Sequence, residues 1–258
     1  MEHAGQLRTR LAASRDDLSP DELDRLARLV LLFLEQPTLP DPHSWFPLFV
    51  PLRQALHDRV TGDHDGDAIE EAFLELYCHL HLHEAPYSPD ERQRMDETGG
   101  YWNHAGGISP LLRAGTHIHP DTVSCDLGAG NGLQGLLLQY LDPHTCTVQV
   151  EISSEAVEIG RHLQAWLGIP DQRVQWVVSD VMDYSVTGIN FLYLYRPVRP
   201  IGPGRPFYEC LAAELDRSPR EVVVFSIADC LGEFLSDRFE VFYSDGHLTC
   251  SRGPAPRD

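Results

Sequence analysis

The stretch Asp126-Leu-Gly128-Ala-Gly130-Asn131-Gly132 lies between a short strand-like run and an apolar helical pattern at 133–141. Glycines at a strand-to-helix turn let the backbone bend sharply, and they let it approach a ligand more closely than any residue with a Cβ atom. The helix that follows presents free backbone amides at its N-terminus. The stretch therefore predicts a ligand-binding loop between the first strand of a sheet and a helix.

The spacing of the glycines argues against a dinucleotide as the ligand. The dinucleotide fingerprint G-x-G-x-x-G needs a glycine at position 133, where this chain has Leu133. The spacing here is G-x-G-x-G instead. Nothing in the loop is suited to a pyrophosphate, so a ligand of another kind is expected.

Strands and helices alternate from about residue 122 onward. Strands are predicted at 123–127, 145–151, 174–178, 190–195 and 221–227, and helices at 133–141, 155–167 and 207–215. The segments 239–243 and 248–251, joined at Asp245-Gly246, are typical of a hairpin. This alternation predicts an α/β fold with a doubly wound, mostly parallel sheet that ends in an antiparallel hairpin.

The first hundred residues are predicted to form helices. Ser19-Pro20-Asp21-Glu22 and Ser88-Pro89-Asp90-Glu91 are capping boxes that start a helix. Apolar stripes at helical spacing continue through 23–33, 45–60 and 68–83. The predicted organisation is a helical cap or bundle at 1–98, a linker or flap at 99–121, and a ligand-binding domain at 122–258.

Composition and charge set expectations about partners and location. The chain has 258 residues, a formal net charge of −19 and no lysine, so it is expected to repel phosphate backbones and anionic membranes. No apolar run approaches the ~20 residues of a membrane span, and the N-terminus lacks the layout of a signal peptide. The six cysteines form no C-x-x-C pair. These features predict a cytoplasmic protein without nucleic-acid or membrane partners; a homo-oligomer is left open.

Acidic residues end the second and third predicted strands. Glu151 closes Val148-Gln-Val-Glu151, and Asp180 follows Val177-Val-Ser. A carboxylate can accept two hydrogen bonds at once, which suits a pair of hydroxyl groups. Both acids can also be explained as helix N-caps or solvated turn residues.

The glycine loop and the two acids, in this order, resemble the class I S-adenosylmethionine-dependent methyltransferases. The resemblance covers about residues 122–252, half of the chain, and it implies a Rossmann-like sheet of seven strands. It also implies that the glycine loop wraps the methionine part of S-adenosylmethionine, that Glu151 holds the ribose hydroxyls, and that Asp180 and the amide of Val181 meet the adenine. The residues predicted to bind this cofactor are Asp126, Gly128, Gly130, Asn131, Gly132, Glu151, Ile152, Asp180 and Val181.

The acceptor side is expected at the end of the fourth strand, which has no Asn-Pro-Pro-Tyr signature. Ligands of open α/β sheets bind beyond the carboxyl ends of the strands, which places Tyr195 and Arg196 there. Arg199 follows in a proline-rich loop, where arginines can clamp an anion or pair with surface acids. Glycine pairs flank Tyr101, Trp102 and His104, a pattern typical of a flap or of a linker. Candidate catalytic residues are His104 and Tyr195, and candidate substrate-binding residues are Tyr101, Trp102, Arg196 and Arg199.

A metal site is not predicted. His79, His81 and His83 would share one face of a strand, but they continue a helical stripe, on which only His79 and His83 align. The motif H-E-x-x-H is absent because Tyr87 stands where its second histidine would be.

The sequence thus predicts an S-adenosylmethionine-dependent methyltransferase that transfers a methyl group to an O, N or C atom of a small molecule, with anionic molecules among the candidates. Two alternatives stay open. One is a methyltransferase acting on a protein side chain, and the other is a non-catalytic module that binds S-adenosylmethionine.

Overall fold

The described residues form one sheet of seven strands in the order β3-β2-β1-β4-β5-β7-β6. A computed structural model describes residues 2–81, 87–100, 107–228 and 230–254. The strands are β1 (Val123–Leu127), β2 (Cys146–Glu151), β3 (Val174–Val178), β4 (Phe191–Tyr195), β5 (Val222–Ile227), β6 (Glu240–Ser244) and β7 (Leu248–Gly253). Strands β1 to β5 pair in parallel, and β7 is antiparallel to both β5 and β6. The predicted α/β fold, with a mostly parallel sheet, is confirmed.

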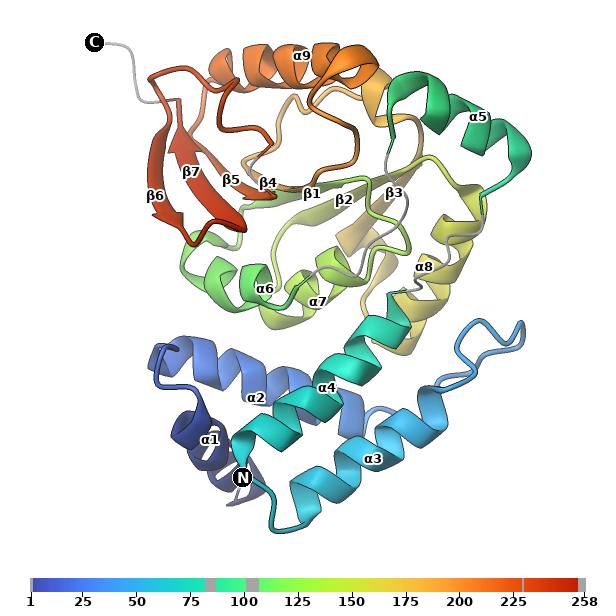
Figure 1. Ribbon diagram of the computed structural model, residues 1–258, viewed down its shortest axis with the longest axis vertical. Coiled ribbons are helices and arrows are strands. Elements are labelled where there is room, and N and C mark those ends of the chain that lie inside the picture. Colours follow the sequence, from blue (N-terminus) through green and yellow to red (C-terminus); the bar gives the residue numbers. More distant parts are fainter. Residues whose placement is uncertain (1, 82–86, 101–106, 229, 255–258) are drawn as a thin grey trace.

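Helices cover both faces of the sheet (Figure 1). α6 (Ser109–Arg113), α7 (Leu133–Leu141) and α8 (Ser154–Trp166) lie on one face, and α9 (Arg205–Asp216) lies on the other. Alternate residues of β4 serve the two layers: Phe191 joins the core under α7, while Leu192 joins the core under α9. This two-sided burial is what a doubly wound sheet requires.

The C-terminal hairpin forms where the sequence predicts it. The Asp245 carboxylate accepts hydrogen bonds from the backbone amides of His247 (2.9 Å) and Leu248 (2.8 Å), and Gly246 has a φ of 85°. These features stabilise the tight turn between β6 and β7. The pairing places β7, and not β6, next to β5.

The N-terminal half is helical, with α1 (Glu2–Ser14), α2 (Pro20–Glu35), α3 (Phe49–Thr61), α4 (Gly66–Leu80) and α5 (Pro89–Thr98). Both predicted capping boxes are present, at Ser19 and at Ser88. α3 begins later than predicted because the carboxylate of Asp41 binds the backbone amides of Trp45 and Phe46 and holds this segment as a loop. α1 had no clear signal in the sequence.

The four helices α1 to α4 pack together, whereas α5 lies in another part of the molecule. α1 to α4 form a group on the far side of α7, and their apolar residues share one core with that face of the sheet (Figure 1). α5 lies apart from them, near the end of β3, where Arg94 pairs with Asp180. None of the helices among the described residues combines the length and apolar composition needed to cross a membrane.

A buried arginine joins the N-terminal helices to the sheet domain. Arg25 of α2 donates from Nε (2.8 Å) and Nη2 (2.6 Å) to the carbonyl of Leu111, and from Nη1 to the Asp142 carboxylate (2.7 Å). Its side chain is only 8% exposed. A buried charge with this many partners is costly to disrupt, since removing one member leaves the others unpaired.

We expect Arg25→Ala to lower the free energy of unfolding by about 3 kcal/mol, because it leaves the Leu111 carbonyl and the Asp142 carboxylate without their donor. Urea unfolding followed by circular dichroism measures this change. Arg28→Ala is the matched control, since exposed Arg28 gives one hydrogen bond, to the carbonyl of Leu141 (2.9 Å), and should cost less than about 1 kcal/mol. Equal losses in the two variants would contradict the role given to Arg25.

Candidate active site

A cleft opens at the carboxyl ends of the parallel strands. Segments after β1, β2, β3 and β4 meet there, as expected for ligand sites in open α/β sheets. Residues from α5 and its flanks complete the wall. The lining residues are Tyr87, Met95, Thr98, Gly100, Gly128, Gly130, Glu151, Ile152, Asp180, Val181, Tyr195, Arg196, Pro197 and Val198.

Gly128 and Gly130 form the floor of the cleft with their backbone. Both have positive φ angles, 78° and 58°. The amides of Gly128 and Ala129 donate to the carbonyl of Val150 at 3.0 and 2.9 Å, which holds the loop against the end of β2. A Cβ atom added to Gly128 would lie 2.8 Å from the Cβ of Pro197. The turn therefore needs glycine here for both its conformation and its close packing.

The other two predicted residues of the loop do not line the cleft. Asn131 is buried, and its Nδ2 donates to the carbonyl of Leu80 at 2.6 Å. Gly132 faces the ring of Trp176, where an added Cβ would lie 2.5 Å from the nearest ring atom. Asn131 thus fastens the end of α4 to the loop, and Gly132 gives room to a core tryptophan.

Glu151 lies at the centre of the cleft wall and is 3% exposed. Its Oε2 accepts from the amide of Gly130 (2.8 Å), and its Oε1 accepts from the amide of Ser153 (2.9 Å). Burial raises the pKa of this carboxyl, and the backbone hydrogen bonds partly oppose that rise. Each oxygen keeps a further lone pair for a ligand.

Asp126 lies on β1, behind the loop, and it does not line the cleft. Burial, with a smaller contribution from the charge of Glu151, raises the pKa of Asp126 to about 8. Asp126 borders a smaller cavity beside Tyr193, whose hydroxyl is buried and has no hydrogen-bond partner among the described residues. Tyr193 is therefore a core residue.

Asp180 follows β3 and connects the cleft to α5. Its Oδ1 accepts from the amide of Met182 (2.9 Å), and its Oδ2 accepts from Nε of Arg94 (2.6 Å). Arg94 is 44% exposed and also lies 3.5 Å from a carboxylate oxygen of Asp183. The carboxylate predicted to meet adenine is thus paired with an arginine of α5, and Val181 borders the cleft beside it.

Tyr195 and Arg196 lie at the end of β4 and line the cleft, as the strand direction predicts. Arg196 has a φ of 43°, a conformation rare for a residue with a side chain. Arg199 is exposed and is not part of the lining, and its backbone amide donates to the carbonyl of Gly99 (2.8 Å). With the bridge between Gly100 and Val198, this bond ties the loop after β4 to the end of α5.

Sequence reasoning missed the contribution of α5. Tyr87, Met95, Thr98 and Gly100 line the cleft together with Pro197 and Val198. The capping box at Ser88 indicated the start of α5, but a capping box carries no information on where a helix docks. The predicted flap residues Tyr101, Trp102 and His104 lie outside the described residues.

No protein-family model matches the chain, and no curated protein matches its sequence. Similar solved structures exist at low identity. The RNA methyltransferase from Salinibacter ruber, in complex with S-adenosyl-L-homocysteine, is 19% identical over 58% of this chain and 91% of its own, with a TM-score of 0.44. The putative methyltransferase YhhF from Escherichia coli is 15% identical over 62% of this chain and 98% of its own, with a TM-score of 0.47.

A third structure, the S-adenosylmethionine-dependent methyltransferase from Agrobacterium tumefaciens, is 12% identical over 59% of this chain, with a TM-score of 0.42. This chain covers 64% of the length of that protein.

The expectation that excludes nucleic acid is wrong, since the similar structures include one described as an RNA methyltransferase. The physical reason lies in what a net charge measures. A value of −19 sums the whole surface and does not describe the potential at one cleft. At this cleft Arg196 is part of the wall.

The fold follows from the sheet itself. A parallel order β3-β2-β1-β4-β5 extends into an antiparallel β7 placed before β6, and the cleft lies where the strand order reverses beside β1. The sheet of this chain therefore has the Rossmann-like fold of the class I S-adenosylmethionine-dependent methyltransferases.

Proposed function

We propose that this protein is an S-adenosylmethionine-dependent methyltransferase whose cofactor occupies the cleft beside the glycine loop. One observation carries the proposal: Gly128, Gly130, Glu151 and Asp180, which the sequence associates with this cofactor, line a single cleft. They come from three different strand ends. A nucleoside-like ligand that extends along the sheet edge would contact all of them.

Each wall residue has a role in this proposal. Glu151 holds the ribose hydroxyls through the lone pairs that its two backbone hydrogen bonds leave available. Asp180 and the amide of Val181 meet the adenine, and Ile152 also lines the cleft. Because Arg94 pairs with Asp180, adenine must share that carboxylate with the guanidinium or displace it.

The charge of the site supports a cationic ligand. Glu151 is buried, and its charge contributes to the raised pKa of Asp126. A positive group in the cleft relieves the cost of burying the negative charge of Glu151. S-adenosylmethionine supplies an electrophilic methyl group on a positively charged sulfonium, and the protein aligns the acceptor and excludes water.

For the acceptor we propose a small molecule that binds beside Tyr195 and Arg196. Both residues line the cleft at the end of β4, beside the wall proposed for the cofactor. Arg196 can pair with an anionic group of the acceptor. His104, Tyr101 and Trp102 follow Gly100, which lines the cleft, so the flap and a general base at His104 stay part of the proposal.

The first prediction concerns the methyl donor. Calorimetry should show that the protein binds S-adenosylmethionine and that Glu151→Ala raises the dissociation constant about 30-fold, because charge-assisted hydrogen bonds worth about 2 kcal/mol are lost. Glu155→Ala is the matched control. Glu155 is an exposed acid at the start of α8, so its loss should leave the affinity unchanged. The cofactor assignment fails if the intact protein shows no binding.

A second prediction separates the acceptor from the donor. Arg196→Ala should keep the affinity for S-adenosylmethionine but reduce transfer of a labelled methyl group to small molecules extracted from cells, since the variant lacks the proposed acceptor contact. Label found in RNA or in protein instead would refute the small-molecule acceptor and leave the donor assignment intact. Binding without transfer to any fraction would favour the non-catalytic module.

The third prediction concerns pH. Because the folded-state pKa of Asp126 is about 8 and the ordinary value is 3.8, the folded protein retains a proton that the unfolded chain has released between these values. The free energy of unfolding should therefore fall with rising pH in this window, by at most about 1.4 kcal/mol per pH unit from this group. Asp126→Asn abolishes that contribution, so its stability relative to the wild type should increase with pH.

Urea unfolding between about pH 5 and pH 8 tests this expectation. Asp237→Asn serves as the control because Asp237 is exposed, so the difference from the wild type should not depend on pH. Parallel stability curves for Asp126→Asn and the wild type would show that Asp126 does not hold the proton.

A further inference from the structure

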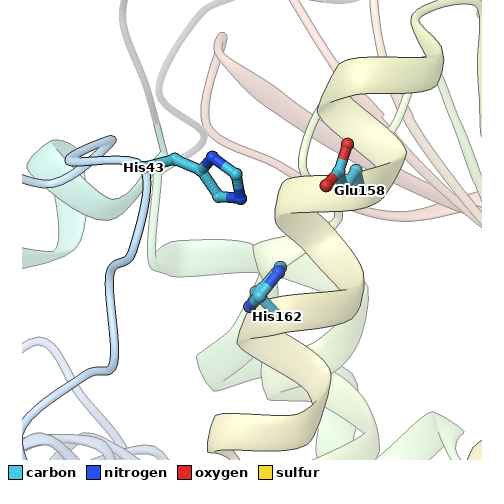
Figure 2. A group of neighbouring side chains, drawn as sticks. All are labelled: His43, Glu158 and His162. Atoms are coloured by element: carbon cyan, nitrogen blue, oxygen red, sulfur yellow. The ribbon is translucent and has the colours of Figure 1, made fainter.

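His43, Glu158 and His162 form a cluster outside the cleft. Each offers one potential ligand atom, and these atoms all lie within 4.8 Å of one another. Figure 2 shows the three side chains converging from two segments: Glu158 and His162 come from α8, and His43 comes from the loop between α2 and α3. Neither the cofactor nor the acceptor site uses any of the three.

The two residues of α8 share one helical face. Glu158 and His162 are four residues apart, so their side chains stand one turn above the other. Such a pair is a common half of a metal site, because both side chains reach the same point from a rigid element. A third ligand from another segment is needed to close it, and His43 occupies that position.

The loop that carries His43 is held against α8 by other contacts. The indole Nε1 of Trp166, at the end of α8, donates to the carbonyl of Pro37 (2.9 Å). The Asp41 carboxylate binds the amides of Trp45 and Phe46 at 2.8 and 2.6 Å. The position of His43 relative to α8 is therefore set before any ligand binds.

Trp45 orients the two imidazoles. Its ring stacks on His43 with a centroid distance of 4.4 Å, and the ring of His162 meets it edge-on at 5.2 Å. The two histidine rings are 6.1 Å apart and nearly perpendicular. Packing against an aromatic ring restricts the rotamers of both imidazoles, which lowers the entropy lost when they coordinate an ion.

The ligand atoms have no competing polar partner. Within residues 2–81, 87–100, 107–228 and 230–254, no hydrogen bond or ion pair involves the side chain of His43, Glu158 or His162. His43 and Glu158 are exposed and His162 is partly exposed, so an ion can enter from solvent.

We propose that His43, Glu158 and His162 bind a divalent transition-metal ion of the Zn²⁺ class, with water completing the coordination. Two imidazoles and one carboxylate are a donor set that suits Zn²⁺, whereas Mg²⁺ and Ca²⁺ prefer oxygen ligands only. Tetrahedral coordination with bonds of ~2.0–2.2 Å places ligand atoms about 3.3 Å apart. Small rotations of these side chains shorten the distances between the ligand atoms from at most 4.8 Å to this value.

The ion would tie the loop at 37–48 to α8. The N-cap of α8 is Ser153, whose amide binds the Glu151 carboxylate, so the same helix borders the proposed cofactor site. The proposed metal site does not depend on the methyltransferase proposal, because none of its ligands lines the cleft.

The test uses the whole 258-residue chain after removal of metals with a chelator. Calorimetry with Zn²⁺ should show one site with a dissociation constant of about 1 μM or lower, and Zn²⁺ should raise the melting temperature. His43→Ala and His162→Ala should each weaken Zn²⁺ binding at least about 100-fold. The loss of a metal ligand costs more than the loss of a residue that only hydrogen-bonds to a ligand. Glu158→Gln should weaken binding as well.

His57→Ala is the matched control, because His57 is an exposed histidine on α3 outside the cluster and should leave Zn²⁺ binding unchanged. Circular dichroism and melting without metal check that each variant folds. Unchanged Zn²⁺ affinity in both His43→Ala and His162→Ala would overturn the proposal, as would the absence of Zn²⁺ binding by the wild type. An equal loss in His57→Ala would show that the ion binds elsewhere.

Discussion

The backbone amide of Gly130 donates a hydrogen bond of 2.8 Å to the carboxylate of Glu151, and this bond joins the ends of two neighbouring strands. The loop after β1 can hold its positive φ angles only if its amides find acceptors, and β2 supplies them through the carbonyl of Val150 and the side chain of Glu151. In return, the backbone amides of Gly130 and Ser153 bind the oxygens of Glu151 and oppose the rise in its pKa that burial causes. The cleft depends on this mutual arrangement.

Other parts of the cleft wall come from segments that lie far in the sequence from Gly130 and Glu151. α5 reaches the end of β3 through Arg94 and Asp180, and its C-terminal end pairs with the loop after β4 through Gly100 and Val198. This small helix thereby spans the cleft from one side to the other. It places a positively charged side chain against the acid proposed to meet adenine, so cofactor binding and the position of α5 are coupled through one ion pair.

The N-terminal helices take a different part. α1 to α4 share a core with α7 and α8, and they support the helices that follow the binding loop and Glu151. Asn131 illustrates the link, since its side chain holds the end of α4 while its backbone belongs to the glycine loop. Among the described residues, α1 to α4 contribute nothing to the lining of the cleft. These helices affect the site because they pack against α7 and α8, and not because they touch the cleft.

Local residue patterns are enough to predict the sheet and the floor of the cleft. Strand periodicity, capping boxes and glycine spacing are local signals, because they depend on φ/ψ preferences and on hydrogen bonds between near neighbours. They placed Gly128, Gly130, Glu151 and Asp180 at strand ends, and the parallel direction of the strands then brings these ends to one edge.

Which of these residues face the cleft depends on how the helices pack against the sheet. Asp126, Asn131 and Gly132 belong to the same motif, yet they face the core or other helices. The docking of α5 and the meeting of His43 with α8 were likewise invisible in the sequence. Contacts between segments far apart in the chain arise from the packing of whole elements, and local residue patterns do not encode them.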